Sequence, residues 1–124
     1  MAARVGIDSM IAMVCDQDAP GADTPTYTLL RNLVADDASS AATAVAGAGS
    51  TVTVNRQPGG GGGFNALTST IALSAADTVY RTTALVAAQK VFVPDDVVQF
   101  VHVNVGTHTR TIVLCTAPQI PGTA

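Results

Sequence analysis

The chain contains no glutamate and only one lysine, Lys90, whereas threonine and valine each occur 16 times. Glutamate and lysine favour helices, while the branched side chains of threonine and valine lose rotamer freedom in a helix and pack well on a strand. The 124 residues are enough for one ordinary domain. The sequence therefore predicts a single all-β domain that spans residues 1–124.

Strand-like alternation of apolar and polar residues runs from residue 50 onward. The expected strands are 50–57, 64–74, 78–87, 91–93, 97–105 and 109–116. In 97–105 one face is expected to carry Val97, Val101, Val103 and Val105, and the other His102 and Asn104. Residues 106–108 are expected to reverse the chain as a hairpin turn. Five or six short strands joined by turns are typical of a β-sandwich, a jelly roll or a small barrel.

The first half of the chain has weaker patterns. Residues 1–25 are expected as an extended arm or loop, although 1–14 also suits a strand or a short helix. Residues 27–34 suit a strand or a helical turn, and 38–46 suit a short helix or a flexible loop. Proline and glycine close to the end indicate an extended tail at 117–124.

A glycine-rich loop is expected at residues 58–63, where Pro58 precedes five consecutive glycines. Phosphate-binding loops use backbone amides in the same way, but they continue with a lysine and a hydroxyl residue. Here Phe64 follows instead. We therefore expect a mobile loop without a ligand, from which three glycines can be deleted without loss of folding.

Charged residues make up 12% of the chain and its net charge is −3. The six cationic side chains are scattered, so no nucleic-acid partner is expected. No apolar stretch reaches the length of a membrane span, and Gly6 and Asp8 interrupt any signal-like run. In a chain that is not secreted, Cys15 and Cys115 are expected as buried free thiols, although one bridge between them is geometrically possible.

Two groups of residues have the chemistry of metal ligands. Asp16, Asp18 and Asp23 lie in a loop-like stretch, but the position that would complete a calcium loop is Tyr27, so a solvated acidic loop is expected. His102 and His108 flank Gly106, but two ligands are too few for most metal sites. Histidines at the surface of strands are the expected alternative.

No set of residues provides both a nucleophile and a base. Cys115 follows an apolar run and is expected to be buried rather than reactive. The pairs Asp36–Asp37 and Asp95–Asp96 are adjacent, so each pair suits a turn rather than acid–base catalysis. We expect no enzymatic activity and no catalytic, cofactor-binding or metal-binding residue.

The stretch 91–103 resembles the Pro-Asp turn and valine-rich strand of viral jelly rolls. In length and in its alanine, threonine, valine and glycine content, the chain is similar to the small cement or decoration proteins of tailed-bacteriophage capsids. The likeness covers mainly residues 64–116 and transfers no functional residue. It implies a structural virion protein on the capsid exterior, assembled in the host cytoplasm, that fastens neighbouring major capsid proteins.

The alternative is a β-sandwich binding module for carbohydrate or peptide, with Phe64 as its candidate aromatic contact. In either case, 48% apolar and 12% charged residues in a small domain predict association with a partner. We expect a homodimer or homotrimer, bound to the major capsid protein and not to a membrane. We expect the arms to carry much of the interface, so deletion of residues 1–20 should weaken association more than folding.

Overall fold

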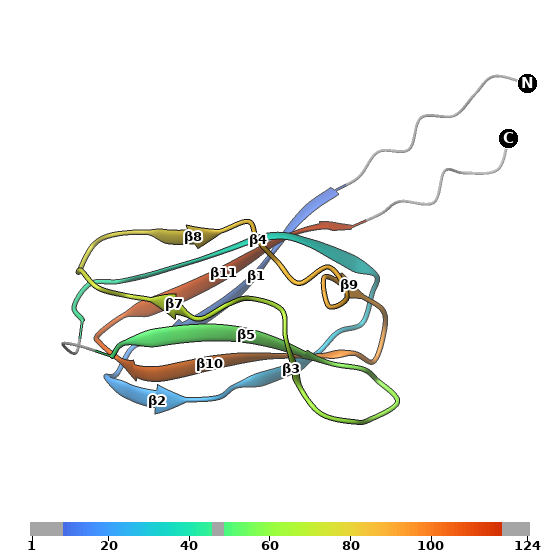
Figure 1. The fold of residues 1–124 in the computed structure, drawn as a ribbon, viewed down its shortest axis with the longest axis horizontal. Coiled ribbons are helices and arrows are strands. Elements are labelled where there is room, and N and C mark those ends of the chain that lie inside the picture. Colours follow the sequence, from blue (N-terminus) through green and yellow to red (C-terminus); the bar gives the residue numbers. More distant parts are fainter. Residues whose placement is uncertain (1–8, 46–48, 118–124) are drawn as a thin grey trace, which may run out of the picture.

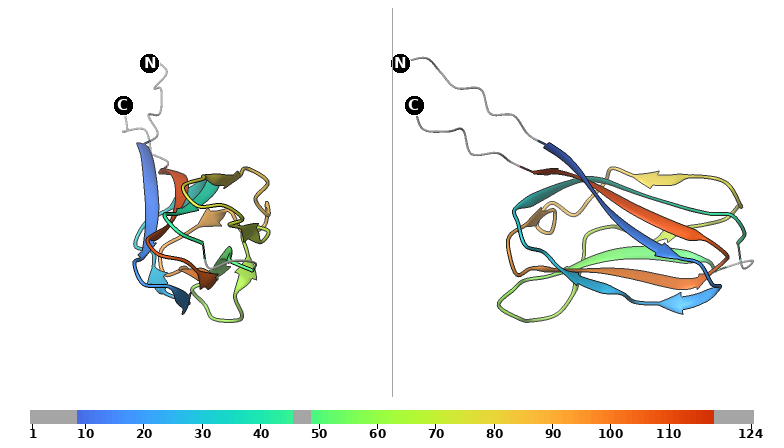
Figure 2. Two further views of the ribbon diagram at one scale, coloured as in Figure 1. Left: turned by 90° about the vertical axis from the view of Figure 1, so that its left-hand side faces the viewer. Right: turned by 180° about the vertical axis from the view of Figure 1, so that it is seen from behind.

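The computed structural model describes residues 9–45 and 49–117, and within these ranges every regular element is a β-strand. The strands form two antiparallel sheets (Figure 1). Figure 2 shows the sheets stacked as two layers. The predicted all-β sandwich is confirmed.

The first sheet has the order β1–β11–β4–β8, and β9 also pairs with β4. Its strands are β1 (Ser9–Gln17), β4 (Leu33–Ala42), β8 (Tyr80–Thr82), β9 (Val91–Phe92) and β11 (Thr109–Ala117). The second sheet has the order β2–β10–β5–β6, with β3 on β10 and β7 on β5. Its strands are β2 (Gly21–Asp23), β3 (Thr26–Thr28), β5 (Thr51–Gln57), β6 (Asn65–Ala66), β7 (Ile71–Ala72) and β10 (Val97–Val105).

The chain moves between the two sheets along most of its length. The short neighbours β2 and β3, β6 and β7, and β8 and β9 can each be counted as one interrupted strand. Eight strands then follow one another in the order of a jelly roll, with a change of sheet at every connection except that from β5 to β6. Strands β1 and β11 lie side by side, with Ser9 opposite Ala117.

The core lies between the sheets and is built from alternate strand positions that point inward. Its largest fully buried apolar side chains are Phe92, Phe100, Leu67 and Leu73. Burial of each such side chain stabilises the fold by about 1.5–3 kcal/mol. The core contains few aromatic residues, and valine, alanine and leucine make up most of it.

Strand β10 turns a different face to the core from the one expected. Its buried residues are Val98, Phe100, His102 and Val105, and its half-buried or exposed residues include Val97, Val101 and Val103. The predicted facing of this strand is therefore wrong for His102, which lies on the core side. Valines occur on both faces of this strand, so the sequence does not indicate which face points to the core. The pairing with β2 is irregular between His102 and Val105, and Asn104 has a φ of 50°, which returns Val105 to the core.

The prediction of a hairpin turn at residues 106–108 is also wrong. Strand β10 belongs to the second sheet and β11 to the first, so this turn carries the chain across the sandwich. Gly106 is buried against the segment that follows β4. A Cβ at Gly106 would lie 1.7 Å from the carbonyl oxygen of Ala44, so only glycine fits.

Three other segments differ from their expected lengths or types. Both alternatives for 38–46, a short helix and a flexible loop, are wrong for residues 38–42, because these residues belong to β4. Residues 46–48 lie outside the described ranges. Within 64–74 and 78–87 only the short strands β6, β7 and β8 form. The side chain of Thr68 accepts a hydrogen bond from the Val54 amide at 3.1 Å, so a side chain replaces ladder pairing there.

The segment 1–25, expected as an arm or loop, contains two strands. Residues 9–17 form β1 and 21–23 form β2, whereas residues 1–8 and the tail residues 118–124 lie outside the described part. Residues 58–63 form a loop with no strand. A hydrogen bond fixes the start of this loop, because the Gly59 amide donates to Asp96 Oδ1 at 2.9 Å.

Candidate functional site

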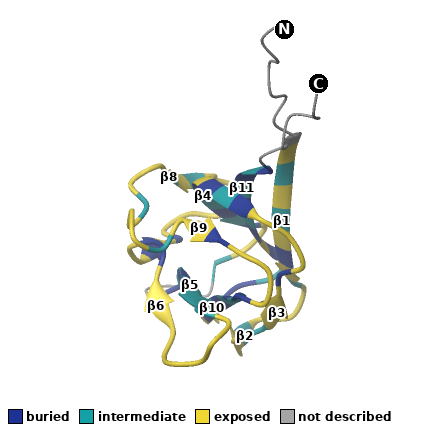
Figure 3. Ribbon diagram, turned by 90° about the vertical axis from the view of Figure 1, so that its right-hand side faces the viewer, coloured by how far each residue is buried: buried dark blue, intermediate teal, exposed yellow. Residues whose placement is uncertain are grey.

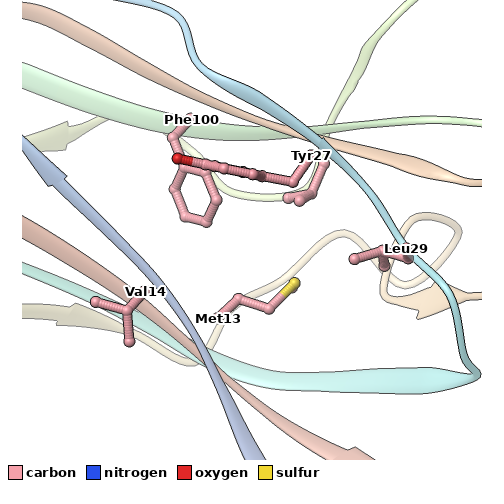
Figure 4. A pocket seen from close by; sticks show the side chains of 6 residues that line it. Met13, Val14, Tyr27, Leu29 and Phe100 are labelled. Atoms are coloured by element: carbon pink, nitrogen blue, oxygen red, sulfur yellow. The ribbon is translucent and has the colours of Figure 1, made fainter.

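A small apolar pocket opens between the edges of the two sheets. Its lining residues are Met13, Val14, Tyr27, Leu29, Val98 and Phe100. Figure 4 shows Met13 and Val14 of β1 on one side of the opening and Tyr27 of β3 and Phe100 of β10 on the other. The Tyr27 ring meets the Phe100 ring edge-on, with centroids 6.2 Å apart and planes at 70°. The volume of about 220 Å³ suits an apolar amino-acid side chain better than a larger ligand.

The pKa values of Tyr27, which lines the pocket, and of its buried neighbour Cys15 are both raised. Burial raises the pKa of the Cys15 thiol, and a hydrogen bond with Tyr27 lowers it by a smaller amount. The neighbouring Cys15 is the main cause that raises the pKa of Tyr27. A protonated thiol is a poor nucleophile. The pocket therefore favours apolar packing over covalent chemistry.

Strand β1 forms one rim of this pocket and is the edge strand of the first sheet. It pairs with β11 over all nine residues, and no strand of the described chain pairs with its other side. On its outer face Met10 is 64% exposed and Val14 is 46% exposed. Figure 3 shows exposed positions along β1 at the side of the sandwich. Apolar residues at an unpaired edge are typical of a surface that contacts another chain.

Strand β10 contributes a histidine to the interior, which corrects the prediction of two histidines at strand surfaces. His102 is fully buried, whereas His108 is exposed and lies 3.4 Å from Asp18 through Nδ1 and Oδ1. The two histidines therefore occupy separate environments and do not form one site. Burial lowers the pKa of His102, and the charge of Asp23 opposes this shift.

The neutral His102 bridges the two sheets by hydrogen bonds. The Gln17 amide nitrogen donates to Ala19 O at 3.0 Å, so its oxygen faces His102 Nδ1 at 3.1 Å and accepts the proton there. His102 Nε2 then accepts from the Thr111 hydroxyl at 3.0 Å. The Ser40 hydroxyl lies 3.0 Å from Thr111 Oγ1 and continues the chain to β4. His102, Thr111 and Ser40 are buried, Gln17 is half-buried, and all four side chains have hydrogen-bond partners. This chain therefore positions strands rather than a substrate.

A second polar cluster lies under the glycine-rich loop. The Asp96 carboxylate is buried and accepts from Arg56 Nε at 2.9 Å and from the Val93 amide at 3.0 Å, besides the Gly59 amide. Burial acts to raise the pKa of Asp96, but these hydrogen bonds outweigh it and hold the pKa below its usual range. Arg56 also lies over the Phe92 ring, 5.9 Å from its centroid. The cluster fixes the loop base and the Pro-Asp turn.

The carboxylates considered as calcium ligands have separate contacts. Asp16 accepts from Arg110 at 2.7 Å and 3.0 Å, and Asp23 accepts from the Thr24 amide at 2.8 Å. Arg110 holds the pKa of Asp16 below its usual range. Within residues 9–45 and 49–117, no three histidine, cysteine or acidic side chains gather to hold a metal ion.

The remaining candidates for catalysis fall into structural roles. Cys15 and Cys115 are both free and buried, as expected, and burial raises the pKa of Cys115 to about 12. Asp95, with a φ of 77°, and Asp96 lie at a turn, as predicted. The turn prediction is wrong for Asp36 and Asp37, which lie in β4 where its register against β11 shifts.

The neighbours of Asp36 and Asp37 explain how two acids fit in a strand. The buried Asp37 carboxylate is paired with Arg81 of β8, whose Nε donates at 3.0 Å. The exposed Asp36 accepts from the Thr116 hydroxyl at 2.7 Å. Partners from neighbouring strands thus satisfy both side chains.

No protein-family model matches the chain, and no curated protein matches its sequence. In the described part of the chain, no helix has the length and apolar character needed to cross a membrane.

Proposed function

We propose that the protein is a structural subunit of a virion, a cement or decoration protein that fastens neighbouring major capsid proteins on the capsid exterior. The observation that carries the proposal is the long unpaired edge of β1 beside an apolar pocket. Such an edge offers a neighbouring chain both backbone hydrogen bonds and apolar contact. Jelly-roll strand order is common in capsid proteins, which supports the proposal by analogy.

The surface of the described chain is also suited to protein contact. Leu30 is 86% exposed and Val79 is 68% exposed, in addition to Met10 and Val14 on β1. Charged residues make up only 12% of the chain, so exposed apolar side chains form a large part of the surface available for contact with another protein. We propose that the protein acts as a dimer or trimer that binds the major capsid protein, without nucleic acid or membrane, after assembly in the host cytoplasm.

Binding to capsids tests this proposal directly. Shells assembled from the major capsid protein alone are mixed with increasing amounts of the purified protein and sedimented. We expect binding that saturates at a fixed number of copies per capsomer and raises the temperature at which the shells disrupt. Shells that sediment without the protein at every concentration would refute the proposal.

A carbohydrate- or peptide-binding module is the second candidate, and the exposed aromatic residues favour it. Tyr27 is 49% exposed at the pocket and Phe64 is 37% exposed after the glycine-rich loop. Aromatic faces of this kind pack against sugar rings or apolar peptide side chains. Saturable binding to a glycan or peptide array that is lost in Tyr27→Ala, without binding to shells, would favour this second function.

A further inference from the structure

We infer that β1 is a self-pairing edge, through which two copies of this chain join antiparallel and continue the first sheet across a two-fold axis. The inference rests on the proposed function and names the surface by which its subunits associate. A second copy of the chain is the proposed occupant of the edge.

The edges of the sandwich differ in length. Strand β1 has nine residues, whereas β2, β3, β6, β7, β8 and β9 have two or three residues each. Short edge strands expose few unpaired backbone groups and are a usual protection against association. Strand β1 lacks this protection, and its sequence SMIAMVCDQ also lacks the proline or lysine that would block pairing. Among the described strands, β1 is therefore the edge best suited to accept another strand.

The sequence of β1 is complementary to itself. An antiparallel register centred on Met13 pairs the whole strand with its copy. The facing residues would be Ser9 with Gln17, Met10 with Asp16, Ile11 with Cys15, and Ala12 with Val14. The two copies of Asp16, the charged residue of the strand, would lie at opposite ends, about 20 Å apart at the usual rise per residue. Each carboxylate is already paired with Arg110 of its own copy, so like charges do not meet.

The apolar pocket lies beside the centre of this register. Met13 and Val14 line the pocket, and Met13 is the residue on the proposed two-fold axis. The β1 strand of the second copy would run along the pocket opening and cover the exposed Val14 side chain. Backbone pairing and apolar cover thus act at the same place, as in other cases of strand addition. The match in strand length and charge favours a second copy over an unrelated strand.

Light scattering coupled to size exclusion tests the inference over a range of concentrations. The wild-type chain is expected at twice its 12.5 kDa mass. Val14→Lys places two lysines near each other at the two-fold axis, and it should raise the dimer dissociation constant by about tenfold or more. Val103→Lys is the matched control because Val14 and Val103 are 46% and 45% exposed, and Val103 lies on β10 of the other sheet. This control should leave the dissociation constant unchanged.

Two further variants test the register. Ala12→Asp combined with Val14→Lys would place opposite charges across the axis and should restore the dimer. Met13→Cys should form a covalent dimer under mild oxidation because the facing Cβ atoms are within disulfide distance, while the native Cys15 and Cys115 are buried. Circular dichroism of each variant checks that the strands are intact.

Several results would overturn the inference: a monomeric or trimeric wild-type chain, equal effects of Val14→Lys and Val103→Lys, or a folded Met13→Cys variant that does not cross-link. A monomer that binds an extended peptide at β1 would also overturn it. The same experiments test the proposed function independently of the self-pairing edge. A dimer that does not bind shells supports the self-pairing edge and refutes the capsid role. A monomer that binds shells refutes the self-pairing edge and supports the capsid role.

Discussion

Replacement of Gly106 by alanine should destabilise the fold strongly, although it adds a single methyl group. The new Cβ would lie 1.7 Å from Ala44 O, 2.5 Å from Ala44 C and 2.9 Å from Val45 Cα. These are backbone atoms, so no side-chain rotation can relieve the overlap, and the segment after β4 must move. Overpacking of this kind costs about 1–3 kcal/mol.

The same movement would break nearby hydrogen bonds. The amide and hydroxyl of Thr43 donate to Thr107 O at 3.1 Å and 3.0 Å. Loss of each costs about 0.5–1.5 kcal/mol. The sum predicts a loss of roughly 2–6 kcal/mol, a large part of the 5–15 kcal/mol typical of a domain.

Urea unfolding followed by far-ultraviolet circular dichroism measures this loss. With a slope of about 2 kcal/mol per molar urea, the midpoint of Gly106→Ala should fall by about 2 M. The control is Gly60→Ala, because a Cβ at Gly60 meets nothing within 4 Å. A Gly106→Ala variant within about 0.5 kcal/mol of the wild type would refute the steric reasoning.

Three other predictions follow from the polar interior and the loop. His102 is kept neutral by burial, while the unfolded chain takes up a proton below about pH 6.5. The free energy of unfolding should therefore fall as the pH drops below about 6.5 toward the lower pKa of His102 in the folded state. The variant His102→Gln should show a smaller fall. Urea midpoints at pH 7.5 and pH 5 measure the difference. Asp96→Asn leaves the charge of Arg56 without its buried partner and should cost about 3 kcal/mol by thermal denaturation; a cost below 1 kcal/mol would contradict the role of the ion pair. Deletion of residues 61–63 should change the unfolding free energy by less than about 1 kcal/mol, because the anchored Gly59 remains; a larger loss would show that the rest of the loop is also structural.

The sequence predicted the elements whose local pattern agrees with their burial. In β5 the alternation of Val52 and Val54 with threonine matches their fully buried positions. The strand at Val91 and Phe92 ends before Pro94, as proline requires. At these positions local propensity and tertiary contacts favour the same structure.

The errors arose where only distant contacts decide the structure. Because β10 has valines on both faces, its sequence does not indicate which face is buried. The buried face is set by the residues that pack against Phe100. The presence of His102 on the same face as Phe100, two residues away, is the signal that could have identified it as buried. The Gly106 turn has the sequence of a hairpin, but its direction depends on the packing against Ala44. The pocket joins residues from three strands, so no local motif records it.

Strand β1 also changes the interpretation of the deletion of residues 1–20. Residues 9–17 pair with β11 and place Cys15 in the core, so this deletion would remove a strand of the sandwich as well as any association surface. Single substitutions on the outer face separate the two effects. The expected weakening of association is therefore better tested at Val14.

The pairing of Ser9 with Ala117 and of Gln17 with Thr109 has a consequence for synthesis on the ribosome. Strand β1 is translated before its neighbour in the sheet, β11, and residues 18–108 lie between the two strands. Until β11 emerges, both backbone edges of β1 lack a partner from their own sheet, and its Met10, Ile11, Met13 and Val14 side chains are open to other nascent chains. Chains on the same polysome would then be prone to pair prematurely, and a slower ribosome would lengthen that exposure.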